Sequence, residues 1–373
     1  MTSPQIDPEG LGARLAAIPV LGLVRAAAEA AGVSAYLVGG SVRDALLGLE
    51  NVDLDVVVEG DHLALVRELG GEARVHDRFG TAAVETREGP IDVAASRAET
   101  YPHPGALPEV RPAPIREDLA RRDFTINAIA VPLAGEPEPI DPYGGVEDLR
   151  AGVLRVLHDR SFVDDPTRAL RGARYAARLG LEPDRETAEL LRAVDLSTVS
   201  GDRVEAELRK LAAEPDPRKG FEVAARWGLV ELAPDAPELI ERVAALVSAE
   251  PWPEVANRVD AVLAARLGAS PQARELAELR PASPSEAVEA AHGRDGIDLA
   301  IARVLGAEWI DRYLAEWRHV RLEISGRDLL DAGVPEGPAV GRGLEAALRA
   351  RLDGEVSGRA EELRLALDAA GAS

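Results

Sequence analysis

The N-terminal part of the chain alternates between short, valine-rich apolar runs and longer segments in which apolar residues recur at helical spacing. Short β-branched runs are typical of strands, and the longer period is typical of amphipathic helices. This alternation predicts a mixed domain of helices and strands. The expected helices cover 11–31, 41–47 and 61–69, and the expected strands cover 35–38, 53–58, 81–85 and 91–95.

Two later segments depart from this alternation. Residues 103–114 are rich in proline and glycine, which predicts a loop rather than a helix or strand. The length of this loop indicates mobility and a functional use. After Gly145, helical periods continue to the end of the chain with few strand signals. The sequence therefore predicts an all-α arm after the mixed domain.

Composition narrows the class of protein. The chain has 373 residues, of which 46% are hydrophobic, so about two to four domains can each bury a core. It contains no cysteine, which excludes disulfides and thiolate metal sites. No apolar run approaches the roughly 20 residues of a membrane span, and Met1–Pro4 begin no secretory signal. We therefore expect a cytoplasmic protein without a membrane partner.

The net charge of −22 argues against nucleic acid as a partner, because phosphate contacts need Lys and Arg. Only two of the 43 basic residues are lysines, Lys210 and Lys219, and the rest are arginines. Guanidinium groups suit bidentate contacts to phosphates and base edges, so local arginine clusters can bind RNA in spite of the negative total. A genome rich in G and C would give the same arginine excess, and composition does not decide between the two.

The most informative motif joins a glycine pair to a pair of aspartates. Gly39 and Gly40 separate the expected strand 35–38 from a helix start, and glycines let a backbone approach a phosphate that helix N–H groups can bind. Asp53 and Asp55 follow at a spacing of two residues, so both point to one face of a strand. Two such carboxylates can bind the same divalent cations. The combination predicts nucleotidyl transfer from a triphosphate.

Each part of this motif also has an ordinary structural explanation. A glycine pair alone is more typical of a tight turn, and an Asp-x-Asp pair alone fits a solvated edge strand equally well. Asp92, in the expected strand 91–95, can face the aspartate pair from a neighbouring strand. Three converging carboxylates can hold two Mg²⁺ ions. A solvent-facing residue after the turn at Pro90 explains Asp92 equally well.

Arginines beside acids recur in two further segments. Arg121, Arg122 and Asp123 combine groups that suit triphosphate oxygens and a ribose hydroxyl, although such triplets are usually surface salt bridges. The second segment, which opens a helix near Pro166, places four side chains at steps of three, where each consecutive pair is adjacent on the helix surface. These side chains are Asp165, Arg168, Arg171 and Arg174.

The pair Asp165 and Arg168 has the polarity of a base reader. A carboxylate accepts and a guanidinium donates, which matches an exocyclic amino group beside a ring-nitrogen acceptor. Cytosine and adenine present that order, and uracil and guanine present the reverse. The pair can therefore admit CTP and ATP and reject UTP and GTP. An exposed helix start with salt-bridging arginines would have the same sequence pattern.

Together these segments resemble class II tRNA nucleotidyltransferases, the family of CCA-adding enzymes and bacterial poly(A) polymerases. The order of the motifs agrees with the family over roughly the first 210 residues, and residues 324–341 are similar to a helical tail segment. One departure is Asp164, where the family usually has Glu. The matching segments are 39–44 with Asp53 and Asp55, 121–128, 141–149, 164–168 and 200–208.

The resemblance implies an α+β fold with a polymerase-β-like nucleotidyltransferase head that contains a mixed sheet, followed by an all-α neck, body and tail. It implies a catalytic head at 1–150, a base-reading neck at 151–215, a body at 216–305 and a tRNA-binding tail at 306–373. It also implies that Asp53 and Asp55 bind Mg²⁺ with Asp92 as the third acid. The implied nucleotide contacts are Gly40, Arg43, Arg122, Arg171 and Arg174, with Asp165 and Arg168 reading the base.

The expected activity is addition of CMP and AMP from CTP and ATP to the 3′ acceptor end of tRNA. An A-adding or CC-adding specialist and a poly(A) polymerase keep the same fold, and the loop 103–114 argues against a CC-only enzyme. A non-catalytic RNA-binding protein is a further alternative, against which the three aspartates weigh. A small-molecule nucleotidyltransferase would need neither the base reader nor the long helical arm.

Overall fold

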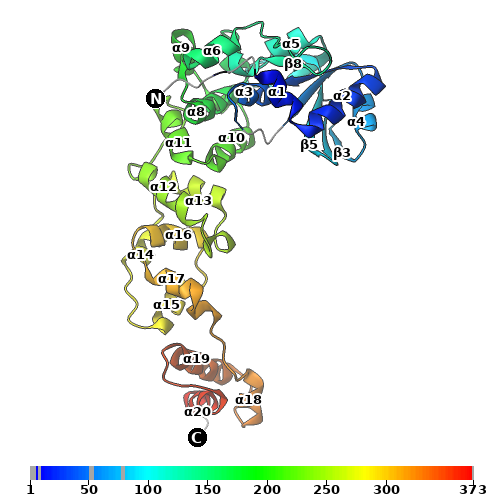
Figure 1. Ribbon diagram of the computed structural model, residues 1–373. Coiled ribbons are helices and arrows are strands. Elements are labelled where there is room, and N and C mark those ends of the chain that lie inside the picture. Colours follow the sequence, from blue (N-terminus) through cyan, green and yellow to red (C-terminus); the bar gives the residue numbers. More distant parts are fainter. Residues whose placement is uncertain (1–5, 7–9, 50–53, 77–79, 372–373) are drawn as a thin grey trace. The chain divides into compact units, whose positions relative to one another are not determined.

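The computed structural model describes residues 6, 10–49, 54–76 and 80–371, and the chain divides into two compact units. The first comprises Met1–Glu214 with Glu222–Val230, and the second comprises Pro215–Phe221 with Glu231–Ser373. All strands that the described residues form belong to the first unit (Figure 1). The α+β class predicted from the sequence is confirmed.

A six-stranded mixed sheet forms the centre of the first unit, in the order β3-β4-β5-β2-β1-β8. The central pair, β2 and β5, is parallel, and every other neighbouring pair is antiparallel. A parallel pair needs a crossover between its strands, and here the chain passes through α4, β3 and β4. The strands are β1 Ser34–Val38, β2 Asp55–Glu59, β3 Glu72–His76, β4 Thr81–Thr86, β5 Gly89–Ala95 and β8 Ala130–Pro132.

The register of the parallel pair decides which side chains share a face. Asp55 pairs with Asp92, and Val57 pairs with Ala94 two residues later. Because strand side chains alternate, all four point to the same face. Val57 is 2% exposed and packs in an apolar cluster with Leu119 and its neighbours, against which Ala94 also packs. The apolar cluster identifies this face of the sheet, and Asp55 and Asp92 lie on the same face at exposed positions.

The expected loop at 103–114 is partly wrong. Residues 109–112 form strand β7 (Glu109–Pro112), which pairs with β6 (Arg97–Thr100) in an antiparallel hairpin. The sequence pattern did not reveal β7 because its residues are all exposed and show no apolar alternation. The connecting loop is therefore shorter, at 101–108. Ala113 continues the pairing pattern, since its N–H donates to the carbonyl of Ser96.

The expected helix over 11–31 is two helices, α1 and α2. Proline restricts the residue before it to extended conformations, and Ile18, with ψ 107°, separates the two helices before Pro19. The other expected helices and strands agree to within one or two residues over the described part. The helices of this unit are α1 Leu11–Ala16, α2 Pro19–Ala31, α3 Gly40–Leu46, α4 His62–Leu69, α5 Ile115–Ala120, α6 Gly145–Ala151, α7 Ser161–Asp164, α8 Thr167–Leu179, α9 Arg185–Leu191 and α10 Gly201–Ala213.

Several short elements of this unit were not predicted. Three-residue and two-residue segments carry too little periodicity to be recognised. Phe124 illustrates what holds them in place, because it is fully buried and packs edge-on against Tyr175 of α8. The short elements are the 3₁₀ helices η2 Thr125–Asn127 and η3 Leu196–Thr198 and the paired strands β9 Val153–Leu154 and β10 Glu182–Pro183.

The second unit contains only helices among its described residues. Helix starts follow polar caps: Asn257, Ser270 and Ser283 each accept hydrogen bonds from N–H groups in the first turn. The last helices share a small apolar core around Leu329 and Ala347. Apart from α11 Pro217–Arg226, which straddles the two units, the helices are α12 Ala236–Leu246, α13 Arg258–Ala265, α14 Pro271–Glu278, α15 Pro284–Ala291, α16 Gly296–Val304, α17 Trp309–Ala315, α18 Gly326–Asp331, α19 Pro338–Leu352 and α20 Arg359–Ala370, with short 3₁₀ helices at Trp252–Glu254 and Trp317–His319.

None of the helices in the described ranges combines the length and the apolar character needed to cross a membrane.

Candidate active site

The turn between β1 and α3 depends on a residue without a side chain. Gly39 has φ 64° and ψ −128°, a conformation that favours glycine. A Cβ at this position would lie 2.7 Å from Nη1 of Arg122. The Gly39 N–H donates to the carbonyl of Ile129 at 3.0 Å, so it is used within the fold. The next helix is tied to β2, because the Asp55 N–H donates to Oγ of Ser41 at 2.9 Å.

Asp55 and Asp92 lie side by side at the start of the parallel pair. Both residues are exposed, although the strand residues that follow Asp55 are buried valines. Carboxylate oxygens on adjacent strands are donors that suit a hard divalent cation such as Mg²⁺. Asp53, the other predicted metal ligand, lies outside the described residues. Within the described residues no group of three or more possible ligands is found, so these two aspartates stand as a pair.

The two aspartates line a cavity of about 690 Å³. This volume is within the usual range for small-molecule sites. The same cavity is lined by residues from the glycine turn, the Arg-Arg-Asp segment and α8, which are far apart in the sequence. The structure thus brings together, around one space, the predicted site residues Gly39, Gly40, Asp55, Asp92, Arg122, Asp123, Asp165, Arg168 and Arg171.

Arg121 and Arg122 are oriented by one buried carboxylate. Asp118 is fully buried; its Oδ1 accepts from Arg121 at 2.8 Å and its Oδ2 accepts from Arg122 at 2.9 Å. Burial would raise the pKa of Asp118, but the charges of Arg122 and Arg121 outweigh it and hold the pKa below its usual range. Arg121 also pairs with Glu99 at 2.9 Å. Both guanidiniums are therefore held at the wall of the cavity rather than in solvent.

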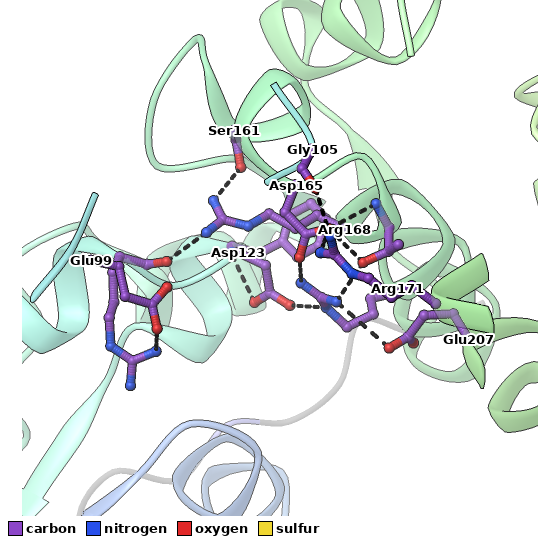
Figure 2. Close-up of polar contacts among 12 residues, drawn as sticks. Glu99, Gly105, Asp123, Ser161, Asp165, Arg168, Arg171 and Glu207 are labelled. Atoms are coloured by element: carbon purple, nitrogen blue, oxygen red, sulfur yellow. Dashed lines mark hydrogen bonds and ion pairs between the residues drawn. The ribbon is translucent and has the colours of Figure 1, made fainter. Parts of the chain in front are cut away.

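Asp123 and Arg171 form the middle of the polar network. Arg171 Nε donates to Asp123 at 3.1 Å, and its other nitrogens reach Asp165 at 3.2 Å and Glu207 at 3.6 Å (Figure 2). Burial opposes ionisation of Asp123, but Arg171 and a hydrogen bond from Asn127 keep its pKa below the usual range. Burial likewise opposes the charge of Arg171, and the three acids raise its pKa above the normal arginine value. Both groups stay charged at neutral pH.

The side chains of Asp165 and Arg168 are buried, and each is held by hydrogen bonds to its own set of partners. Asp165 is 8% exposed and accepts from Thr167, Arg171 and Arg203. Arg168 is 3% exposed and donates to Oγ of Ser161 at 2.9 Å (Figure 2) and to the backbone carbonyl of Arg121 at 2.7 Å. A salt-bridged exposed helix start, the alternative left open by the sequence, does not fit these burial values. Both side chains instead line the cavity.

Two predicted nucleotide contacts do not line the cavity. Arg43 and Arg174 lie against the ring of Tyr175, with guanidinium carbons 5.1 and 4.8 Å from its centroid. Arg43 is further held by Asn127 at 2.7 Å, and Arg174 is paired with Glu214 at 3.2 Å. Cation–π contacts of this kind restrict the position of an aromatic ring. Tyr175 itself lines the cavity, so these arginines support the cavity wall through its ring.

Sequence reasoning missed three cavity residues that the network needs. Tyr101 donates its hydroxyl to Glu99 at 2.9 Å and lies near Arg168. Arg203 of α10 donates to Asp165. The segment 200–208 was noted as a family motif, but no role followed from it. Tyr101 and Glu99 precede the expected loop, where no pattern marked them; their proximity to Arg168 depends on the hairpin.

Comparison with known proteins places the site within a family. Residues 35–155 match the Poly A polymerase head domain. The CC-adding tRNA nucleotidyltransferase of Deinococcus radiodurans is 38% identical over 350 residues, which cover 89% of this chain and 88% of that protein. The chain spans less than half the length of the A-adding tRNA nucleotidyltransferases from Halalkalibacterium halodurans and Geobacter sulfurreducens that it also matches.

Solved structures agree with this match over nearly the whole chain. A CCA-adding enzyme in complex with ATP is 27% identical with a TM-score of 0.78, covering 99% of each chain. The Thermotoga maritima CCA-adding enzyme in complex with tRNA is 28% identical with a TM-score of 0.72, covering 98% of this chain and 99% of that chain. The predicted resemblance is confirmed, and the chain belongs to the tRNA nucleotidyltransferase family.

Proposed function

We propose that this protein adds CMP and AMP from CTP and ATP to the 3′ end of tRNA, without a template, and releases pyrophosphate. The observation that carries the proposal is that one cavity is lined by a carboxylate pair, Asp55 and Asp92, and by a donor–acceptor pair of base-reading polarity, Asp165 and Arg168. The first pair suits phosphoryl chemistry and the second suits selection of a base. The complexes of similar enzymes with ATP and with tRNA support this assignment.

The reaction is an in-line displacement at the α-phosphorus of the nucleotide. The terminal 3′-oxygen of the tRNA forms the new bond to phosphorus, and the bond to the bridging oxygen of the pyrophosphate breaks. In this proposal Asp55 and Asp92, together with Asp53, hold the divalent metal, Mg²⁺. When bound, the metal supplies charge neutralisation for the attacking and leaving oxygens. The family's chemistry requires such an ion, and the exposed carboxylate oxygens have the donor chemistry for it.

The protein's own side chains orient the nucleotide. Arg122 lies beside the glycine turn at Gly39, where the absence of a side chain lets its guanidinium approach the backbone. In the proposal Arg122 and Arg171 contact the triphosphate, and Asp123 contacts the ribose. Gly40, Arg43 and Arg174 complete the set, the two arginines acting through Tyr175, against which both lie. Arginines that are already held by carboxylates lose little side-chain entropy when a ligand binds.

Base selection follows from hydrogen-bond polarity. Asp165 accepts from the exocyclic amino group of cytosine or adenine, and Arg168 donates to the adjacent ring nitrogen. Uracil and guanine would place an acceptor against the carboxylate and a donor against the guanidinium. Each mismatch leaves buried polar groups unpaired at about 1–3 kcal/mol. The two contacts together give strong discrimination without a template.

We also propose how the whole chain is divided into functional regions and which product it makes. The head 1–150, neck 151–215, body 216–305 and tail 306–373 are proposed divisions, with the tail binding tRNA and the reaction taking place in the cytoplasm.

Relatives include A-adding, CC-adding and multifunctional CCA proteins. The β6–β7 loop favours complete CCA addition over a CC-only product. A truncated chain that ends near residue 307 should bind tRNA less tightly than the full chain at matched salt, and its tRNA affinity should fall more than its nucleotide affinity.

One assay tests the central proposal. The protein is incubated with tRNA that ends before CCA, after C and after CC, with CTP and ATP supplied singly and together, and product lengths are read on a gel. Complete CCA addition requires both nucleotides on the shortest substrate and only ATP on the longest. Addition of A alone, of CC alone or of a long A tail would identify the specialist or poly(A) alternative. Binding of tRNA without any extension would identify a non-catalytic protein.

A further inference from the structure

Arg203 connects two parts of the cavity wall that are distant in sequence. It lies in the first turn of α10, and its side chain is 27% exposed. Nη1 donates to the backbone carbonyl of Gly105 at 2.8 Å, and Nη2 donates to Oδ1 of Asp165 at 3.0 Å (Figure 2). Two donors of one planar guanidinium thus hold a loop carbonyl and a carboxylate in a fixed relation.

The two oxygens of Asp165 are used unequally. Oδ1 accepts from the N–H of Thr167 at 3.0 Å, from its hydroxyl at 2.6 Å and from Arg203. Oδ2 accepts from Arg171 at 3.2 Å. A carboxylate offers about two lone-pair directions on each oxygen. Oδ1 is therefore saturated by its own surroundings, whereas Oδ2 keeps capacity for a further donor.

The loop contact at Gly105 is equally restrictive. Gly105 has φ +70°, and a Cβ there would lie 2.4 Å from the carbonyl oxygen of Thr198. Its N–H donates to the carbonyl of Val163 at 3.1 Å. The β6–β7 loop is thus fastened at this residue to α7 and lies against η3, and Arg203 binds the carbonyl, the remaining polar group of the same residue. We call the Arg203 guanidinium with its two hydrogen bonds, to Gly105 and to Asp165, the fork. A shift of the loop would move one end of this fork and so disturb Asp165.

We propose that Arg203 is the positioning residue of the base-reading carboxylate, which it orients so that Oδ2 of Asp165 accepts the exocyclic amino group of the incoming nucleotide. This inference rests on the proposed function. It adds which oxygen of Asp165 accepts the amino group and which residue holds that oxygen in place. The terminal torsion of an aspartate is soft, so without the contact from Arg203 the plane of the carboxylate rotates more freely and neither oxygen is held firmly at the position that Oδ2 now occupies. Against the effect of burial, the charge of Arg171, a hydrogen bond from Thr167 and the charge of Arg203 together keep the pKa of Asp165 below its usual range.

The test compares three variants in single-nucleotide addition to tRNA that lacks CCA, with each of the four nucleoside triphosphates supplied alone. Arg203→Gln removes the fork, and Arg203→Lys keeps the charge with one contact. Arg209→Gln is the matched control, since Arg209 lies on the same helix in an exposed pair with Glu205 at 3.5 Å. Circular dichroism and thermal unfolding check that each variant folds.

We expect Arg203→Gln to lower the ratio of CTP to UTP addition about tenfold, through a lower kcat for CTP and a higher rate with UTP, while KM for CTP changes less than twofold. Arg203→Lys should recover part of the ratio, and it carries the test alone if the glutamine variant does not fold. Arg209→Gln should match the wild type. An equal loss of addition with CTP and with UTP, which leaves their ratio unchanged, would overturn the proposal. Failure of the wild type to add C or A at all would instead refute the proposed function.

Discussion

The cavity holds two carboxylate centres that are positioned in opposite ways. Asp55 and Asp92 are exposed, and their spacing comes from the backbone register of two parallel strands. Asp165 is buried, and its place comes from the side chains of three residues that donate to it, Thr167, Arg171 and Arg203. A centre set by backbone register leaves carboxylate oxygens accessible to a ligand. A centre set by side chains trades that access for a fixed orientation. The two should therefore respond differently to substitution.

The largest effect is expected at the strand pair. Asp55→Asn or Asp92→Asn removes a charge that the transition state needs, and the rate of nucleotide addition should fall at least about a thousandfold, equivalent to several kcal/mol. The melting temperature should stay close to that of the wild type, because exposed residues contribute little to the core. Single-turnover addition and thermal unfolding measure the two effects. Asp53→Asn is expected to behave in the same way.

Near-normal turnover of the Asp55 variant in Mg²⁺ would refute the assignment of this centre. A large drop in melting temperature would show instead that the carboxylate is structural.

Asp165→Asn should have the next largest effect, and of a different kind. An amide can present either an acceptor or a donor, so discrimination between CTP and UTP should fall about 5-fold to 150-fold, as expected for a loss of 1–3 kcal/mol. Stability should also fall, since Arg171 and Arg203 lose a buried counter-charge. Initial rates with each nucleotide and thermal unfolding measure both. The exposed neighbour Asp159 provides a control as Asp159→Asn.

If the Asp165 variant keeps strict preference for CTP and ATP, the carboxylate does not read the base, and the comparison between the two centres loses its functional basis.

The same contrast explains what the sequence could predict. Asp55 and Asp92 lie in short apolar runs that predict strands. Alternation relates side chains only within one strand, so the pairing and register of β2 with β5, which place both aspartates on one face, had to be supplied by the structure. Asp165 and Arg168 were recognisable from their spacing and polarity. Tyr101, Glu99 and Arg203 were not, because their contacts exist only where the β6–β7 hairpin meets Arg121, α8 and α10, and contacts between distant segments leave no local periodicity. The hairpin itself was hidden by the exposed residues of β7.

Asp118 offers a third and smaller test, because this buried carboxylate holds Arg121 and Arg122. The pKa of Asp118 is held below its usual range, so its contribution to stability is present above about pH 3.9 and is lost as the pH falls through the lower folded value. Asp118→Asn should lower the free energy of unfolding by about 2 kcal/mol at neutral pH. Urea unfolding from pH 7 down to pH 2 should show a flatter acid limb in the variant than in the wild type. An unchanged acid limb would mean that the carboxylate does not bind Arg121 and Arg122 as described.

The smallest effect is expected for Tyr101→Phe. The variant loses the hydroxyl bond to Glu99, which should lower the unfolding free energy by at most about 1 kcal/mol. Burial and the charge of Glu99 raise the pKa of Tyr101 to about 12. The folded state therefore keeps this proton between pH 10 and pH 12 while the unfolded state releases it, and stability falls with rising pH across that interval. Absorbance titration near 295 nm should show a late-titrating tyrosine that the variant lacks.

The parallel pairing of β2 and β5 also has a consequence for how this protein tolerates changes in length. The two strands bond to each other directly, so the spacing of Asp55 and Asp92 does not depend on the chain between them. The turn between β4 and β5, at Arg87 and Glu88, is exposed and lies beyond the pairing. An inserted peptide tag at that turn should leave catalysis intact. A single residue inserted within β5 would instead rotate Asp92 to the opposite face of the sheet. The exposed turn at Arg87 and Glu88 is thus a permissive position for an insertion, whereas β5, which begins at the next residue, is not.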